Sequence, residues 1–194
     1  LRDDEFIFVR CGSRDVERFN LVRHTTELLF RSVVVPERAA SSSALVAIAG
    51  GAQIQIWHAP SGAPSPAESH DHSLTASVLP PSENVITGLA VDGLDVWWTR
   101  RDESITSLHY DARPGWDTVL REEYRGLGAK GALAVRASTV FWSDNEKSIV
   151  SMAQGSRAPK WVQSFIYASE ITSMAADSTW VFWVAQNTLY RNAH

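Results

Sequence analysis

Three segments of the chain repeat one pattern at a nearly constant spacing, and no other feature of the sequence constrains the fold as strongly. In each segment a short apolar strand precedes a second strand that contains a valine, an aromatic residue and a tryptophan. The three tryptophans, Trp98, Trp142 and Trp183, are separated by 44 and 41 residues. Repetition at this period, with two short strands per copy and no helical pattern between them, is typical of sheets arranged around a common axis.

The two internal copies each predict four strands joined by turns that are rich in Gly, Asp, Asn or charged residues. The first copy reads as strands 86–91, 94–99, 104–110 and 116–121, and the second as 132–135, 139–143, 148–152 and 161–167. The last copy supplies strands 171–176, 180–185 and 188–191 and lacks an outer strand. Four antiparallel strands per copy are the blade of a β-propeller, so we predict this all-β fold.

The pattern weakens upstream of residue 86 but persists. Residues 44–49 and 53–57 predict an apolar hairpin, and 74–79 an outer strand beyond a loop rich in Pro and Ser. Residues 6–10, 16–23 and 28–35 are further strand candidates, and 25–31 fits either a strand or a helical turn.

We therefore expect one propeller domain over residues 1–194, with four to five blades in either an incomplete or a small ring. We divide it into a degenerate N-terminal blade (1–43), a blade with the long loop (44–85), two regular blades (86–129 and 130–169) and a blade without its outer strand (170–194). The unpaired edge of the last blade needs a cover, and residues 5–10 are a candidate strand for closing the ring.

The paired aromatic residues predict a core between blades. An inner strand that is covered on both faces loses its polar alternation, and neighbouring residues on a strand point to opposite faces. Trp97–Trp98, Phe141–Trp142 and Phe182–Trp183 therefore place one large ring on each face. For Trp57, Trp116 and Trp161 a second interpretation stays open, namely a stacking platform for sugars or a choline-type cation.

The segment 86–93, followed by Val96–Trp97–Trp98–Thr99 and Ser104–Ile105, resembles the YWTD-type repeat of low-density-lipoprotein-receptor-like propellers and their bacterial relatives. The resemblance covers residues 86–194. It implies a six-bladed propeller class used mainly in protein interaction, with distant relatives that bind calcium and hydrolyse lactones. The resemblance also favours an extracytoplasmic location, although the compartment stays open.

Composition excludes several classes of function. A net charge of −4 provides no excess of basic residues for binding nucleic acid. No apolar run is long enough for a membrane span, and no secretory signal is visible at the first residues. The single cysteine, Cys11, has no partner for an intramolecular disulfide and is interpreted as a small core residue.

None of the polar clusters carries a strong chemical signature. The stretch 68–72 (Glu-Ser-His-Asp-His) has metal-ligand chemistry but lies in the Pro/Ser-rich loop without a distant partner. Asp102–Glu103 and 144–146 lack the spacing of a calcium loop, and the glycine-rich 126–131 precedes a strand, as an inter-blade linker would. No Gly-x-Ser-x-Gly motif occurs. We assign no catalytic, cofactor-binding or metal-binding residue and expect no cofactor.

These observations favour a non-enzymatic interaction or assembly scaffold that binds a protein partner or a larger complex through its rim loops and its incomplete edge. One alternative is a lactonase or lyase with a divalent cation at the axial channel, which would bring three or more carboxylate, amide or histidine groups together there. A second alternative is a lectin, which would expose Trp116 and Trp161 beside a pocket.

Overall fold

The computed structural model describes residues 5–10, 12–32, 35–42, 44–58, 85–101, 104–109, 120–125, 129–144, 148–156, 158–163 and 171–194. These residues form five antiparallel sheets and no helix. The first sheet contains β1 (Glu5–Val9), β2 (Asp15–Asn20) and β3 (Thr25–Arg31), and the second β4 (Arg38–Ser41), β5 (Leu45–Gly50) and β6 (Gln53–His58). The third contains β7 (Ile86–Asp92), β8 (Asp95–Arg100), β9 (Ser104–His109) and β10 (Leu120–Arg125). The fourth contains β11 (Ala129–Arg136), β12 (Thr139–Asp144), β13 (Ser148–Ala153) and β14 (Lys160–Gln163), and the fifth β15 (Ile171–Ala176), β16 (Trp180–Ala185) and β17 (Thr188–Ala193).

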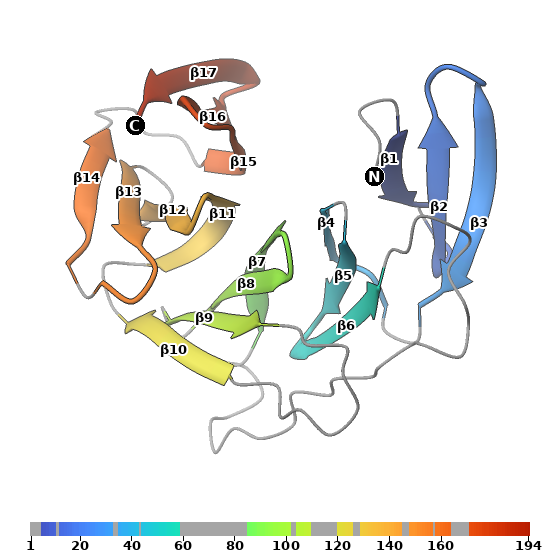
Figure 1. Ribbon diagram of the computed structural model, residues 1–194, viewed down its shortest axis with the longest axis horizontal. Coiled ribbons are helices and arrows are strands. Elements are labelled where there is room, and N and C mark those ends of the chain that lie inside the picture. The colour runs from blue at the N-terminus through green and yellow to red at the C-terminus, as the bar shows by residue number, and fades with distance from the viewer. Residues whose placement is uncertain are drawn as a thin grey trace.

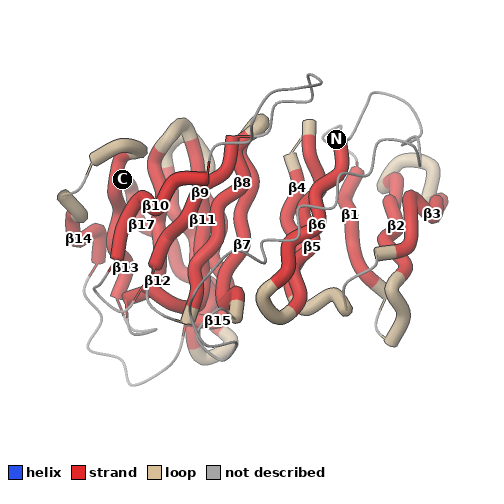
Figure 2. The backbone as a smooth tube through the Cα atoms, turned by 90° about the horizontal axis from the view of Figure 1, so that it is seen from below, coloured by secondary structure: helices blue, strands red, loops and turns tan. Residues whose placement is uncertain are grey.

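Each sheet is a meander whose strands follow chain order, because every strand pairs with the next one along the chain. Figure 1 shows the five sheets as a fan around a common centre, with the first strand of each sheet innermost. The first and last sheets lie at the two ends of this arc. Seen from the side in Figure 2, the sheets stand next to one another and the arc is about one strand length thick.

The last four sheets share one register at their centre. The tryptophan of each second strand lies opposite an aliphatic residue of the first strand, in the pairs Val46–Trp57, Leu89–Trp98, Leu133–Trp142 and Met174–Trp183. The residue before each tryptophan lies opposite an alanine, in the pairs Ala47–Ile56, Ala90–Trp97, Ala134–Phe141 and Ala175–Phe182. A small residue at this position leaves room for the large ring beside it.

On each second strand the tryptophan and the residue before it point toward different neighbouring sheets. Trp98 packs in the cluster between the second and third sheets, whereas Trp97 packs in the cluster between the third and fourth. Trp142 joins Trp97 in that second cluster, and Phe141 faces the fifth sheet. The prediction that these rings form the core is confirmed for Trp97, Trp98, Phe141, Trp142 and Trp183, which are at most 3% exposed, but not for Phe182, which is only partly buried. Trp57, which the sequence left open, is a core residue too: it packs between the first and second sheets.

The structure corrects the predicted organisation of the N-terminal part. Residues 25–31 form a strand, β3, and not a helical turn. Residues 38–41 form β4, which pairs with β5, so the boundary drawn at 43/44 falls inside the second sheet. The expected ring-closing strand pairs with β2 in the first sheet, because a short connection brings these two strands together more easily than a long-range closure does.

Other boundaries differ by a few residues. The outer strand of the third sheet is β10, about four residues later than predicted, and β11 begins within the expected glycine-rich linker. The predicted outer strand 74–79, the cluster 68–72, Asp102–Glu103, Cys11 and Trp116 all lie outside the described residues.

The turn between β15 and β16 depends on Asp177. Its carboxylate accepts hydrogen bonds from the backbone N–H groups of Thr179 and Trp180, both at 2.7 Å. These bonds favour the ionised form and hold the pKa of Asp177 below its ordinary value of 3.8. The stabilisation is therefore complete above that ordinary value and is lost as the pH falls from there through the lowered pKa of the folded state.

We expect the stability difference between the native chain and Asp177→Asn to shrink as the pH is lowered from about 5 to about 2. Urea unfolding at several pH values measures this difference. A difference that stays constant over this range would contradict the assignment.

Candidate functional site

The second strands of the third and fourth sheets differ in burial from the second strand of the last sheet. In β8 and β12 four consecutive residues are buried, as expected for strands that are covered on both faces. In β16 buried and partly buried residues alternate, which is the pattern of a sheet that is covered on one face only. Within the part of the chain that the structure describes, the last sheet therefore has an open face.

This C-terminal open face is mostly apolar. It consists of Trp180, Phe182 and Val184 of β16 together with Leu189 and Arg191 of β17, which lie opposite Val184 and Phe182 in the register. Leu189 is 68% exposed. The Arg191 guanidinium lies over the Trp180 ring at 4.6 Å, so the cation covers part of the apolar surface and stays accessible to water.

The first sheet has a matching N-terminal open face. Ile7 and Val9 pack against the second sheet, so the alternate residues of β1 point away from it. The face consists of Phe6, Phe8, Phe19 and Leu28, together with Glu17, which lies opposite Phe8 and Leu28 in the register and is paired with Arg10. Phe6 lies 6.0 Å from Phe8 and 5.3 Å from Phe19 between ring centroids, which places the three rings on one face. Phe6 is 45% exposed and Leu28 58%.

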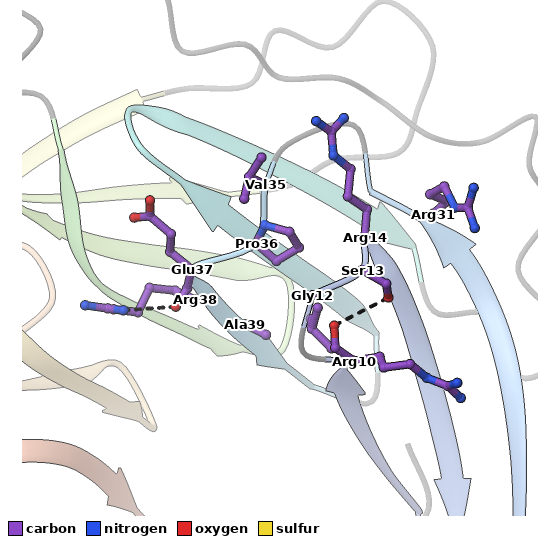
Figure 3. A pocket seen from close by; sticks show the side chains of 11 residues that line it. Arg10, Gly12, Ser13, Arg14, Arg31, Val35, Pro36, Glu37, Arg38 and Ala39 are labelled. Atoms are coloured by element: carbon purple, nitrogen blue, oxygen red, sulfur yellow. Dashed lines mark hydrogen bonds between the residues drawn. The ribbon is translucent and has the colours of Figure 1, made fainter.

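A pocket of about 930 Å³ lies at one rim between the first and second sheets (Figure 3). It is lined by the β1–β2 turn, the end of β3 and the segment that enters β4. Four arginines contribute to the lining: Arg10, Arg14, Arg31 and Arg38. Arg38 donates from Nε to the Thr87 carbonyl at 3.2 Å and from a terminal nitrogen to the Glu37 carbonyl at 2.9 Å.

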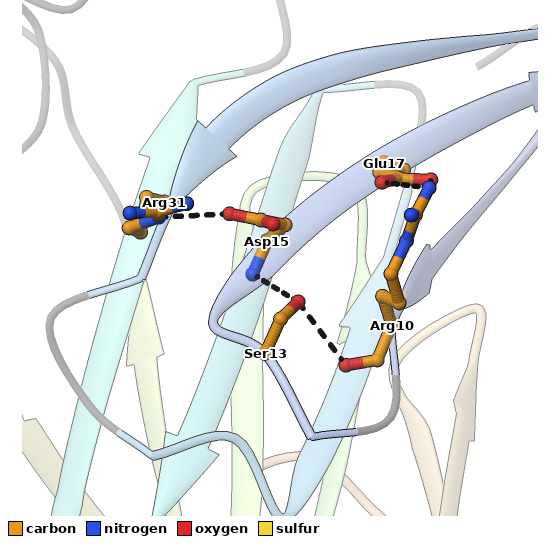
Figure 4. A network of polar contacts seen from close by, with 5 residues as sticks. All are labelled: Arg10, Ser13, Asp15, Glu17 and Arg31. Carbon is orange, nitrogen blue, oxygen red and sulfur yellow. Dashed lines mark hydrogen bonds and ion pairs between the residues drawn. The ribbon is translucent and has the colours of Figure 1, made fainter.

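Two of these arginines form ion pairs with acidic residues of the first sheet (Figure 4). Arg10 binds Glu17 at 2.7 Å and Arg31 binds Asp15 at 2.8 Å. The hydrogen bond from Arg31 holds the pKa of the Asp15 carboxyl below its ordinary value, and the bond to Glu17 raises the pKa of Arg10. Ser13 joins the two pairs, since its hydroxyl donates to the Arg10 carbonyl and accepts from the Asp15 N–H. The network stabilises the turn and pairs two of the four lining arginines with carboxylates, and Glu37 also lines the pocket.

The structure brings together few of the residues that the sequence singled out. Among the described residues, no group of three or more His, Cys, Asp and Glu side chains could hold a metal ion. Trp161 on β14 is 55% exposed but does not line the pocket. The sequence predicted contacts through the rim loops and the incomplete edge, but it did not identify the residues of the arginine-lined pocket or of the two open faces. Phe6 and Phe8 alternate with Ile7 and Val9, which indicates a strand with two distinct faces. Because both sets of residues are apolar, the sequence did not indicate which of the two faces is covered.

Comparison with solved structures identifies the fold. The chain superimposes on a structure of the nidogen/laminin complex with a TM-score of 0.67, at 15% identity over 98% of this chain and 72% of the other. It matches Hsv2 of Kluyveromyces lactis with a TM-score of 0.63, at 9% identity over the whole of this chain and 59% of that one. No protein-family model and no curated protein matches the sequence.

The chain has the fold of a β-propeller. The predicted fold is thus confirmed, and its five sheets are propeller blades. A third match is PorZ, a surface component of the type-IX secretion system of Porphyromonas gingivalis, with a TM-score of 0.57 and 14% identity; this chain covers 24% of it. In the described part of the propeller no helix is long and apolar enough to cross a membrane.

Proposed function

We propose that this propeller is a non-enzymatic interaction or assembly scaffold, which contacts its protein partners through one rim and through the two open faces. The observation that carries the proposal is that, among the described residues, the first and last blades each leave a largely apolar face exposed, while the second strands of the third and fourth blades are buried on both faces. Contiguous exposed apolar surface on a folded protein marks an interaction site.

The residues on these faces are those that carry binding energy in interfaces. Aromatic side chains and arginine are enriched at the centres of protein–protein contacts, and the C-terminal open face combines Trp180, Phe182 and Arg191. The arginine-lined pocket adds a polar contact region beside the first blade. A propeller from the nidogen/laminin complex, which is itself a protein assembly, supports the same role. No observation on the described residues favours the lactonase, lyase or lectin alternatives.

Site-specific photo-crosslinking in the native host tests the proposal. A benzophenone amino acid is placed at Phe182, at Leu28 or at Ser13 on the rim, and a control is placed at Trp161, an exposed aromatic residue on an outer strand. We expect discrete protein adducts from one or more of the first three positions and none from Trp161. No adduct from any of them, or the same adducts from Trp161, would contradict an interaction role for these surfaces.

A further inference from the structure

We infer that the turn between β2 and β3 docks on a bilayer that contains anionic lipid and inserts two aliphatic side chains into its interface. The turn consists of residues 21–24 (Leu-Val-Arg-His), which we call the docking tip. It belongs to neither open face and does not line the arginine-lined pocket, so this role is separate from the protein contacts proposed above. The exposure, the fixed shape, the charge and the position of the tip carry the inference.

The docking tip exposes two adjacent aliphatic side chains. Leu21 is 49% exposed and Val22 73%, which is the largest exposure of any large hydrophobic side chain among the described residues. Other tight turns of the described chain carry small or polar residues, apart from Leu94, which is 36% exposed. These turns are 51–52, 93–94, 137–138 and 186–187. Leu21 and Val22 add little to the core from this position, so their exposed surface is available to a partner outside the chain.

Hydrogen bonds from a neighbouring side chain hold the tip in one shape. The Asn20 side-chain oxygen accepts bonds from the backbone N–H groups of Val22 at 3.1 Å and of Arg23 at 2.7 Å. The Asn20 amide nitrogen donates to the Glu5 carboxylate at 3.4 Å, which ties the turn to β1. His24 completes the turn with φ at 52°. A turn that is ordered before it binds loses little conformational entropy on binding.

The charge of the tip favours an anionic surface. Arg23 and His24 are exposed, and residues 20–26 contain no Asp or Glu. Among the described residues Arg23 has no ion-pair partner, whereas Arg18 on β2 binds Glu27 at 2.6 Å. A guanidinium beside two exposed aliphatic side chains can contact lipid phosphate while those side chains enter the boundary between headgroups and acyl chains. The chemistry of the tip therefore matches that of an anionic bilayer surface.

The position of the tip suits a lipid surface better than a protein. In Figure 1 the β2–β3 turn lies at the edge of the molecule, at one end of the arc. A protein partner would have to supply a groove for a protruding turn, whereas a fluid bilayer adapts to it. Because β2 and β3 are antiparallel, the β1–β2 turn and the end of β3, which line the pocket, lie at the opposite end of the hairpin. Docking of the tip therefore leaves the pocket on the side away from the lipid.

Co-sedimentation of the full chain with vesicles of phosphatidylglycerol and phosphatidylcholine in equal parts tests the inference. We expect the native chain to bind these vesicles. The double variant Leu21→Ser/Val22→Ser should bind at least about tenfold more weakly, because the two aliphatic side chains no longer leave water. Arg23→Gln should weaken binding about fivefold through the loss of one cation near the anionic surface. On vesicles of phosphatidylcholine alone, Arg23→Gln and the native chain should bind alike.

Leu189→Ser is the matched control. Leu189 is 68% exposed on β17, outside the tip, so this variant should bind vesicles as the native chain does. The substituted side chains are exposed, so all variants should keep the thermal unfolding midpoint of the native chain.

Absence of vesicle binding by the native chain would overturn the inference, as would equal binding by the double variant or an equal loss for Leu189→Ser. Discrete protein adducts from a benzophenone amino acid at Val22 in the native host would also overturn it, because the partner of the tip would then be a protein. These outcomes are separable from failure of the proposed function, since adducts at Phe182, Leu28 or Ser13 do not depend on vesicle binding.

Discussion

Phe141→Ala should lower the free energy of unfolding by about 3–5 kcal/mol, whereas Phe182→Ala, at the equivalent position of the next blade, should cost about 1–2 kcal/mol. Phe141 is fully buried between the fourth and fifth blades and contacts the His194 ring at 4.8 Å. Removing it leaves an enclosed cavity. Phe182 borders an open face, so its removal loses contacts within one sheet and encloses no cavity.

Urea unfolding followed by tryptophan fluorescence measures both losses. Trp161→Ala is the matched control, because Trp161 is more than half exposed, and its loss should be within about 0.5 kcal/mol. Equal losses for Phe141→Ala and Phe182→Ala would show that both faces are covered in the isolated chain, and the open-face description would then be wrong.

Gly88→Ala should destabilise the protein by about 3 kcal/mol or more, since the added methyl has no space. A Cβ at Gly88 would overlap the Gly131 carbonyl oxygen of the next blade and lie 2.7 Å from the Thr99 hydroxyl oxygen. That hydroxyl itself donates to the Gly131 carbonyl at 3.3 Å. Backbone cannot move away cheaply here, because the third and fourth blades meet at this point.

Gly93→Ala provides the comparison. Gly93 lies in the turn between β7 and β8 with φ at 58°, and nothing lies within 4 Å of its added Cβ. Its substitution should cost about 1–2 kcal/mol through backbone strain alone. The same urea titration compares the two variants. A smaller loss for Gly88→Ala than for Gly93→Ala would mean that the two blades do not approach as closely as described.

Much of the fold could be predicted because the signal is local. Strand formation follows from apolar pairs between turn residues, and the place of Trp98, Trp142 and Trp183 follows from their shared surroundings in the sequence. Trp57 could have been added on the same grounds, since it precedes Trp98 by 41 residues. The start of the second blade was missed because the short β4 carries little apolar pattern of its own.

The candidate site could not be predicted in the same way. The pairs Arg10–Glu17 and Arg31–Asp15 require the register of the first sheet and the turn that Ser13 holds, and charged residues of both signs are common enough that spacing does not reveal which of them meet. The pocket depends on how the first and second blades are placed, which no short segment encodes.

Phe141 and Phe182 show that the sequence pattern determines the position of a ring on its strand but not its burial. Both stand between a valine and a tryptophan, and both lie opposite an alanine, so their residues alone specify a ring on one face of an inner strand. Whether that ring is buried depends on the blade that comes next, because burial is a property of the neighbour as much as of the residue. The strand and its two faces follow from local chemistry, and the covering of each face follows from the assembled arc.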